Sequence, residues 1–466
     1  MAGEVQGPPV VHAERIGPAR HHVYVRPGFL WESYSLYRAL EGSRHDVVVF
    51  GPGAAYCAGR AKQLGLGFES TTIVVRCGRP TLQQAVLERR PFLTKSRLGR
   101  GITERLALEL ADALICDEPD AVPWMRDEGW TLPYRVAADD EAGWNLALAP
   151  LPSDGVEKVE ARPLVSVVVP FHERTQYLTQ CLEGFARQTY GALEVVVADD
   201  GSPSAAAQEL LAELESRSWP WPLRIVRAPH TGYPGEVRNA GWREARGELV
   251  VFLDDDDVPF DEFVSTLVHG RAASGADVVA AGARLFRGDG EPAPRRGDFI
   301  HLPLGEPREL GLISNQFGGP ACLWPRTLLD RLGGFRGIPR GFEDWELLAR
   351  ASLSGARVVG TPEPLYWYRQ TPGSVYSADP HANVHDAVAA LAALHAERLP
   401  DGSRLLPLLA AGAYSELERH SRDATPRHRR IAARGRLLVR RTREVRAGEG
   451  VAGVLRRAVR FVRRGR

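Results

Sequence analysis

Short apolar runs alternate with amphipathic stretches along most of the chain, and this alternation predicts an α/β fold. In residues 21–150, apolar runs of strand length are separated by helical patterns. A second series begins at Leu164 with LVSVVVP, whose unbroken apolar character is typical of a parallel strand covered on both faces. Strands and helices then alternate to about residue 370. Such alternation predicts mostly parallel sheets, because a helix makes each connection between neighbouring strands.

This pattern divides the 466 residues into segments, as expected at roughly 100–200 residues per domain. The predicted segments are a disordered N-terminus (1–20), a smaller Rossmann-like α/β domain (21–150), a linker (151–163), a larger α/β domain (164–380), a helical extension (381–424) and a basic amphipathic tail (425–466). Within the larger domain, residues 287–320 are rich in Gly and Pro and are predicted to form a long loop that closes over bound substrates.

The composition excludes several classes of protein. Hydrophobic residues make up 44% of the chain, which is too many for a disordered protein. The five cysteines form no CxxC pair, which argues against a disulfide scaffold or a zinc ribbon. The first residues lack the apolar core of a signal peptide, and no apolar run reaches the roughly 18 residues of a membrane span. These features predict a cytoplasmic protein.

Charge is distributed unevenly along the chain. The tail 425–466 has a net charge of +13, whereas the remaining residues carry −12. Between Val451 and Val462, apolar residues recur with helical spacing and arginines occupy the other face. A basic amphipathic helix of this kind binds anionic membrane surfaces, so we expect peripheral attachment at the inner face of the plasma membrane. A solvated tail is the plainer alternative, and nucleic acid is a less favoured partner.

Acidic residues follow two of the predicted strands. Asp199 and Asp200 end VVVADDGS, and Asp254–Asp257 end VVFLDDDD. Ligands of open α/β sheets bind beyond the carboxyl ends of the strands. A carboxylate followed by Gly-Ser can accept hydrogen bonds from a base or a ribose, although DDGS is also ordinary turn chemistry.

The four consecutive aspartates predict a cation site. Adjacent carboxylates repel one another at neutral pH, and a divalent cation among them relieves the repulsion. Mg²⁺ and Mn²⁺ prefer such hard oxygen ligands together with substrate phosphates. FLDDDD is therefore interpreted as a clamp for Mn²⁺ or Mg²⁺ and a diphosphate, and a solvated acidic turn is the alternative.

A third acidic pair, Glu343 and Asp344, opens an amphipathic helix in GFEDWELLAR. Carboxylates in a first helical turn are often simple capping residues. The helix dipole would lower the pKa of Asp344, whereas Glu343 and a nearby diphosphate would raise it, and the sequence does not decide between them.

Together these motifs resemble glycosyltransferase family 2, whose members are inverting enzymes with a GT-A fold. The similarity covers residues 164–370, through SVVVPFHER, LEVVVADDGS, GEVRNAGWREARGELVVFLDDDD and GFEDWELLAR. It implies that the larger domain is a GT-A nucleotide-sugar-binding domain. The N-terminal domain is faintly similar, through ERLALELADALICDEPDAVPWMRDEGWTLPYRV, to the acceptor-side half of GT-B glycosyltransferases.

The family 2 resemblance also implies roles for individual residues. Asp344 matches the general base, with Glu343 beside it, and Asp254 and Asp256 match the metal-binding DXD signature. Trp345 is predicted either to face the acceptor or to pack in the core. The residues implied to bind the nucleotide-sugar are Pro170, Phe171, His172, Asp199, Asp200, Arg238, Asn239, Asp254 and Asp255. His172 stands where this family often has Tyr, which leaves the identity of the base open.

The implied reaction transfers a sugar from a nucleoside-diphosphate donor, with UDP or dTDP favoured, to a hydroxyl of a cell-surface glycan or lipid-linked precursor. Asp344 removes the proton of that hydroxyl, and a single displacement inverts the anomeric centre. Two alternatives remain. A sugar-phosphate nucleotidyltransferase would need a Gly-rich basic loop where this chain has VVVPFHERT, and a non-catalytic scaffold would not need all three acidic motifs.

Overall fold

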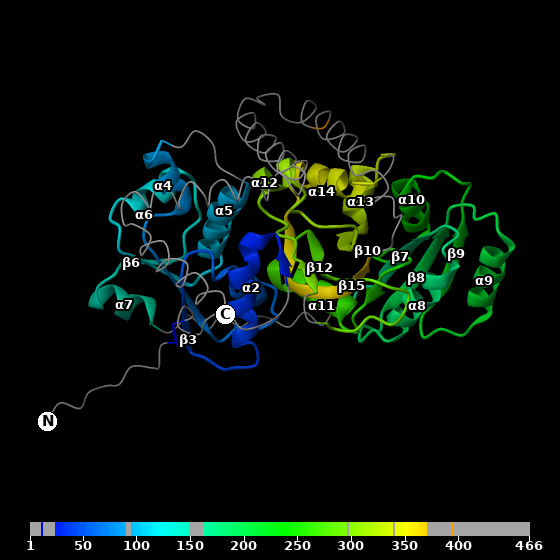
Figure 1. Ribbon diagram of the computed structural model, residues 1–466, viewed down its shortest axis with the longest axis horizontal. Helices are drawn as coiled ribbons and strands as arrows, with labels where there is room; N and C mark the ends of the chain where they lie inside the picture. Colours follow the sequence, from blue (N-terminus) through cyan, green and yellow to red (C-terminus); the bar gives the residue numbers. More distant parts are fainter. Residues whose placement is uncertain are drawn as a thin grey trace, which may run out of the picture. The chain divides into compact units, whose positions relative to one another are not determined.

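The structure is a computed structural model that describes residues 11–12, 24–89, 95–149, 162–295, 298–338, 341–370 and 394. These residues form a five-stranded and a ten-stranded sheet with flanking helices (Figure 1). Among the described helices, none is both long enough and apolar enough to cross a bilayer. The predicted helical extension, apart from Leu394, and the basic tail lie outside the described residues.

The five-stranded sheet is parallel throughout and confirms the Rossmann-like pattern, with strand order β1-β3-β4-β5-β6. Its strands are β1 (Val11–His12), β3 (Val47–Phe50), β4 (Thr72–Cys77), β5 (Ala113–Cys116) and β6 (Arg135–Ala138). The accompanying helices are η1 (Gly28–Leu30), α2 (Trp31–Leu40), α3 (Tyr56–Gln63), α4 (Thr81–Leu87), α5 (Lys95–Glu109), α6 (Ala121–Asp127) and α7 (Glu141–Ala147). Alternate residues of the strands bury both faces: Val48 and Val75 belong to one apolar cluster, and Val49 and Val74 to another.

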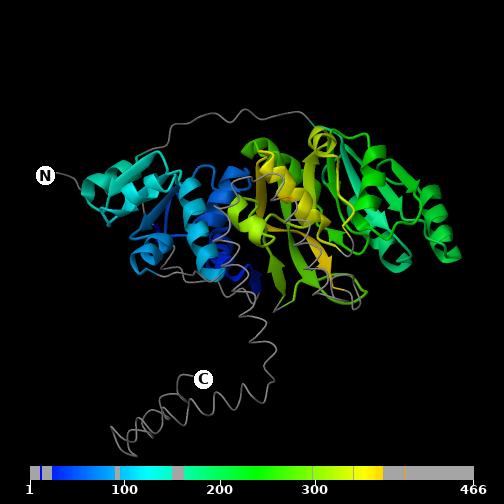
Figure 2. The same cartoon turned by 90° about the horizontal axis from the view of Figure 1, so that it is seen from above.

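The N-terminal segment contributes strands to both sheets. Residues 1–20 were expected to be disordered; of these, the structure describes Val11–His12, which form β1 beside β3. Within the smaller domain expected over residues 21–150, β2 (Tyr24–Arg26) instead pairs with β13 of the ten-stranded sheet (Figure 2). Apolar periodicity identifies a strand without identifying the sheet edge that it joins, because any edge offers unpaired backbone groups.

The ten-stranded sheet is mixed, with order β11-β15-β12-β14-β10-β7-β8-β9, and β13 and β2 extend it from β12. Its further strands are β7 (Val165–Phe171), β8 (Leu193–Asp199), β9 (Leu223–Arg227), β10 (Leu249–Phe252), β11 (Val258–Pro259), β12 (Val278–Phe286), β13 (Phe299–His301), β14 (Cys322–Pro325) and β15 (Val358–Arg369). The helices are α8 (Thr175–Ala186), α9 (Ala205–Ser216), α10 (Pro234–Glu244), α11 (Phe263–Ser274), α12 (Arg308–Ile313), α13 (Arg326–Leu332) and α14 (Glu343–Leu353). The mostly parallel GT-A-type arrangement confirms the fold class expected from the sequence.

The neighbouring strands β10, β7 and β8 are parallel, so their carboxyl ends share one edge of the sheet. They form as buried strands because their apolar residues are continuous, and the first five residues of β7 are all buried. Local sequence features determine where the adjacent helices begin and end. Helix α10 begins at Pro234, and α11 and α13 end before Gly275 and Gly333, which have φ of 66° and 77°.

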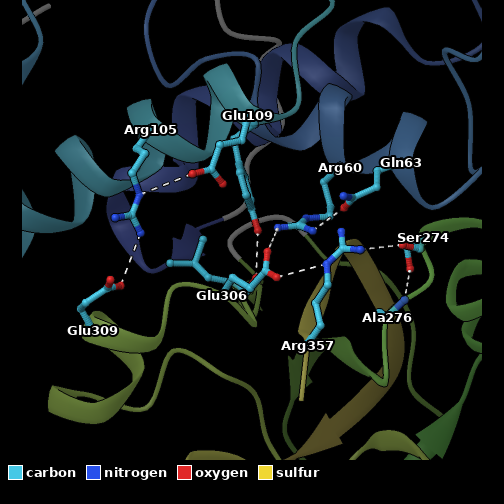
Figure 3. Close-up of polar contacts among 11 residues, drawn as sticks. Arg60, Gln63, Arg105, Glu109, Ser274, Ala276, Glu306, Glu309 and Arg357 are labelled. Atoms are coloured by element: carbon cyan, nitrogen blue, oxygen red, sulfur yellow. Dashed lines mark hydrogen bonds and ion pairs between the residues drawn. The ribbon is translucent and has the colours of Figure 1, made fainter. Parts of the chain in front are cut away.

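An ionic network connects α3 and α5 of the first sheet to the loop around α12 (Figure 3). Glu306 lies 3.7 Å from the buried guanidinium of Arg60 and 3.3 Å from that of Arg357. Beyond the next two residues, Glu309 lies 3.4 Å from Arg105 of α5. Two arginines of the N-terminal domain, Arg60 and Arg105, therefore hold the segment that begins α12.

This network continues to the helix that carries the third acidic pair. The Gly311 carbonyl of α12 accepts a hydrogen bond from Trp345 Nε1 of α14 at 2.6 Å. Residues 287–320, expected to be a long loop, thus contain β13 and α12 and pack against both domains. The N-terminal domain thus contacts α12, and α12 in turn contacts the helix that carries Asp344.

Candidate active site

The predicted acidic motifs meet where β7, β8 and β10 end. Phe171 of β7 is the register partner of Asp199 of β8, and the Asp200 amide donates to the Phe171 carbonyl at 2.9 Å. Asp254 follows β10, which is hydrogen-bonded to β7 on its other side. The sheet thus brings together residues more than 50 positions apart in the chain.

Asp199 and Asp200 are both buried and have different partners. Asp199 Oδ1 accepts from the Ser202 amide at 3.1 Å, which is the turn interaction that its sequence allowed. Asp200 accepts from the Thr231 amide at 2.8 Å, the Thr231 hydroxyl at 3.0 Å and the Gly232 amide at 2.9 Å. Asp200 therefore fixes the loop after β9 against the end of β8.

Pro170, Phe171 and His172, at the end of β7, were predicted to bind the nucleotide, but they differ in burial. Phe171 is 2% exposed and packs in the core of the sheet, so its predicted place in the lining of a nucleotide pocket is not supported. Pro170 and His172 remain partly exposed. The His172 ring stacks on that of His230, with centroids 4.5 Å apart and planes 23° from parallel.

The carboxylates of the run Asp254–Asp257 differ in how completely they are buried. The side chains of Asp254 and Asp256 are 25% and 10% exposed, whereas Asp255 and Asp257 are each 1% exposed. Burial raises the pKa values of Asp255, Asp256 and Asp257; the positive charge of Arg174 lowers them, and the neighbouring aspartates raise them further. The two residues predicted as metal ligands are thus the less completely buried ones.

Arg174 lies against this acidic run, and sequence reasoning missed it. Its guanidinium is 2.8 Å from Asp255 Oδ1 and 2.5 Å from Asp256 Oδ2, and its side chain is 44% exposed. It was not recognised because only the fold brings the loop after β7 beside the end of β10. A basic residue just past the opening loop was the one available signal.

Arg238 bridges two of the acidic motifs. It is 4% exposed, its Nη2 is 2.5 Å from Asp254 Oδ1, and its Nη1 is hydrogen-bonded to Glu343 Oε1. Arg238 is thus a buried ion-pair partner and not a solvent-exposed charge of α10. Asn239, expected beside the nucleotide, instead bonds both the amide and the carbonyl of Phe335, at 2.9 and 2.8 Å. This contact holds the segment before α14 against α10.

Asp344 lies in the first turn of α14, and its pKa is raised to about 7. Burial is the first cause and the negative charge of Glu343 the second, and together they outweigh Arg238, which acts in the opposite direction. Trp345 is 7% exposed and packs against Phe342 at 6.0 Å between ring centroids. Of its two predicted roles, the structure therefore supports packing.

Residues 166–341 match Glycosyl transferase family 2. Glycosyltransferase GlyG of Streptococcus pneumoniae serotype 4 is 26% identical over 46% of this chain and 72% of its own length. Putative glycosyltransferase EpsH of Bacillus subtilis is 33% identical over 44% of this chain and 61% of its own length.

Among solved structures, the chain is similar to a mannosyltransferase from Pyrobaculum calidifontis in complex with GDP-Man and Mn²⁺. The identity is 18%, the TM-score is 0.41, and the match covers 65% of this chain and 88% of the other. The family match spans Asp199–Asp200 and Asp254–Asp257 and ends two residues before Glu343.

Proposed function

We propose that this chain, whose residues 166–341 match Glycosyl transferase family 2, is an inverting, metal-dependent enzyme acting on a nucleoside-diphosphate sugar. The proposal rests on the contacts of Arg238. Arg238 joins Asp254 of the predicted metal motif to Glu343, the neighbour of the predicted base. The residues proposed for donor binding and for proton transfer therefore lie around one guanidinium.

The acidic run has the donor set that Mn²⁺ or Mg²⁺ requires. Within the described residues, neither carboxylate oxygen of Asp255 makes a hydrogen bond, although Arg174 forms an ion pair with it. Buried carboxylates with so few partners are stabilised by an added cation. We propose Asp254 and Asp256 as the ligands, with Arg174 moving away through its exposed side. When bound, the metal supplies electrostatic stabilisation of the departing diphosphate.

The chain's own residues supply binding and proton transfer. Asp199 and Asp200, with Pro170 and His172, are proposed to contact the nucleoside of the donor. Asp344 is proposed to take the proton of the acceptor hydroxyl, and its pKa of about 7 suits a base that works near neutral pH. Attack from the face opposite the leaving group then gives inversion.

A thermal-shift panel tests the donor site. UDP, dTDP, GDP and CDP are each added with and without Mn²⁺. We expect one diphosphate, UDP or dTDP, to stabilise the protein only when metal is present, because the phosphates and the carboxylates share the cation. A ligand at 100 times its dissociation constant adds about 2.7 kcal/mol of stability.

Two carboxylate variants make this test specific. Asp256→Asn should abolish the metal-dependent shift, whereas Asp261→Asn, at an exposed carboxylate paired with Arg187, should preserve it. If no diphosphate stabilises the protein with or without metal, the donor-site proposal is wrong and the scaffold alternative becomes the better explanation.

The acceptor is proposed to be a cell-surface glycan or a lipid-linked precursor, reached from the cytoplasmic face of the membrane. The net charge of +13 in residues 425–466 supports this location. In a flotation assay, the full chain should rise with vesicles containing phosphatidylglycerol, and a chain ending at residue 424 should not. Equal flotation of both chains would contradict a role for the tail, and neutral vesicles provide the control.

A further inference from the structure

Three side chains outside the acidic run converge from three loops. His172 follows β7, Asp200 follows β8 and His230 follows β9. Each of them offers one ligand atom, and these atoms all lie within 4.8 Å of one another. We propose that His172, Asp200 and His230 form a second cation site, selective for metals that prefer imidazole, with Zn²⁺ as the representative ion.

The donor set distinguishes this site from the one proposed at Asp254 and Asp256. Two imidazoles and one carboxylate suit zinc, copper or nickel, whereas ligands made only of oxygen suit magnesium, manganese or calcium. His230 Nδ1 is 3.0 Å from Asp200 Oδ2, a separation that two ligands of one ion can adopt. His172 Nδ1 is buried and makes no hydrogen bond to any described residue. That nitrogen therefore has an unused lone pair or proton.

The loops that carry the three ligands are held by hydrogen bonds. Three donors from Thr231 and Gly232 orient the Asp200 carboxylate, as partners outside the ligand set orient the ligands of metal sites. The Glu173 amide donates to Ser202 Oγ at 3.1 Å and fixes the turn after His172. Gly201, with φ of 65°, permits the close approach, because a Cβ there would lie 2.7 Å from the His230 amide nitrogen.

One adjustment completes the site. Ligand atoms around a tetrahedral Zn²⁺ with bonds of about 2.0–2.2 Å are roughly 3.3 Å apart, which is closer than the widest separation here. The stacked rings must tilt toward each other to reach it. The His230 side chain is 56% exposed, so it can rotate, and the same exposure leaves a path for the ion from solvent.

A bound ion would also affect the donor site, and this consequence rests on the proposed function. Asp200 and His172 are the residues proposed to contact the nucleoside. An ion coordinated by the Asp200 carboxylate and the two imidazoles would leave Asp200 and His172 unable to contact the nucleoside. We therefore infer that Zn²⁺ and the donor nucleotide exclude each other at this end of β8.

The test begins with metal binding to the full-length, chelator-treated protein. Zn²⁺ is titrated calorimetrically, and Co²⁺ is used as a probe because its visible spectrum reports its ligands. We expect one ion to bind, and affinity to fall by at least about tenfold in His172→Asn and in His230→Gln. His45→Gln, on the other domain, is the matched control and should bind as the wild type does. Unchanged affinity in both site variants, with unchanged unfolding midpoints, overturns the proposal.

A second measurement separates this inference from the proposed function. UDP binding is measured at saturating Mn²⁺ with increasing Zn²⁺. The apparent dissociation constant for UDP should rise with Zn²⁺ in the wild type and rise much less in His230→Gln. Zn²⁺ binding without any effect on UDP overturns the exclusion. A protein that binds no nucleoside diphosphate contradicts the proposed function, while the Zn²⁺ titration still decides whether the site exists.

Discussion

Replacing Asp344 with asparagine is expected to lower kcat by about 10²–10⁴-fold, the usual contribution of a general base. Asparagine keeps the size of the side chain but cannot accept the acceptor's proton. Binding of the nucleoside diphosphate with Mn²⁺ should persist, because Asp344 is not among the residues proposed to hold either ligand. Turnover in single-turnover assays and nucleotide affinity by calorimetry measure the two effects separately. Loss of both together would remove Asp344 from the role of base.

The same residue predicts the pH dependence of the reaction. The base acts in its deprotonated form, and the pKa of Asp344 is raised to about 7. Below that value the carboxyl holds a proton, so kcat/KM should increase with pH until about 7 and then level off. The profile of kcat/KM reports the free enzyme, to which this pKa refers.

Glu343→Gln supplies a matched variant for the pH profile. Glu343 is the second cause of the raised pKa, so removing its charge should lower the pKa of Asp344 and shift the rising limb toward acid. Arg238 would also lose one of its two partners and act more strongly on Asp344. A limb that stays in place, or moves toward alkaline pH, would show that another group controls the profile.

Much of the larger domain could be predicted because its signals are local. Buried parallel strands appear as continuous apolar runs, and the acidic residues stand directly after them. The parallel order of β10, β7 and β8 then brings the strand ends together without further information. The positions of Asp199, Asp200 and Asp254 at one edge follow from these facts alone.

What could not be predicted depends on contacts between distant segments. The pairing of β2 with β13 joins residues 24–26 to 299–301, and no local pattern specifies it. Arg174 and His230 lie in loops, and the sequence around them does not indicate that they pair with Asp255, Asp256 and Asp200. The pKa of Asp344 was undecided because burial, the largest cause, is a property of the folded chain.

Asn239 and Trp345 show a different limit. Both lie within motifs that resemble those of the family. On that ground Asn239 was expected beside the nucleotide, and Trp345 was expected either to face the acceptor or to pack in the core. In the structure, Asn239 bonds the Phe335 backbone and Trp345 bonds the Gly311 carbonyl. A residue of a functional motif can therefore act by holding the segments that carry the chemistry, and its sequence position does not distinguish the two roles.

Arg238 is expected to be the residue whose loss destabilises the site most. Its guanidinium is buried between Asp254 and Glu343, and Glu343 is itself 4% exposed. Removing one partner of a buried ion pair typically costs about 3–5 kcal/mol, because a buried charge is left without compensation. We therefore expect Arg238→Met to lower the free energy of unfolding by about that amount, as measured by urea denaturation, and to reduce turnover.

Two further variants establish the cause of that loss. Arg243→Met, on the exposed side of the same helix, should change the free energy of unfolding by less than about 0.5 kcal/mol. Adding Glu343→Gln to Arg238→Met should recover part of the lost stability, because it removes one of the uncompensated buried charges. If the double variant is no more stable than Arg238→Met alone, the loss arises from packing. In that case the bridge between the metal motif and the base helix is not electrostatic.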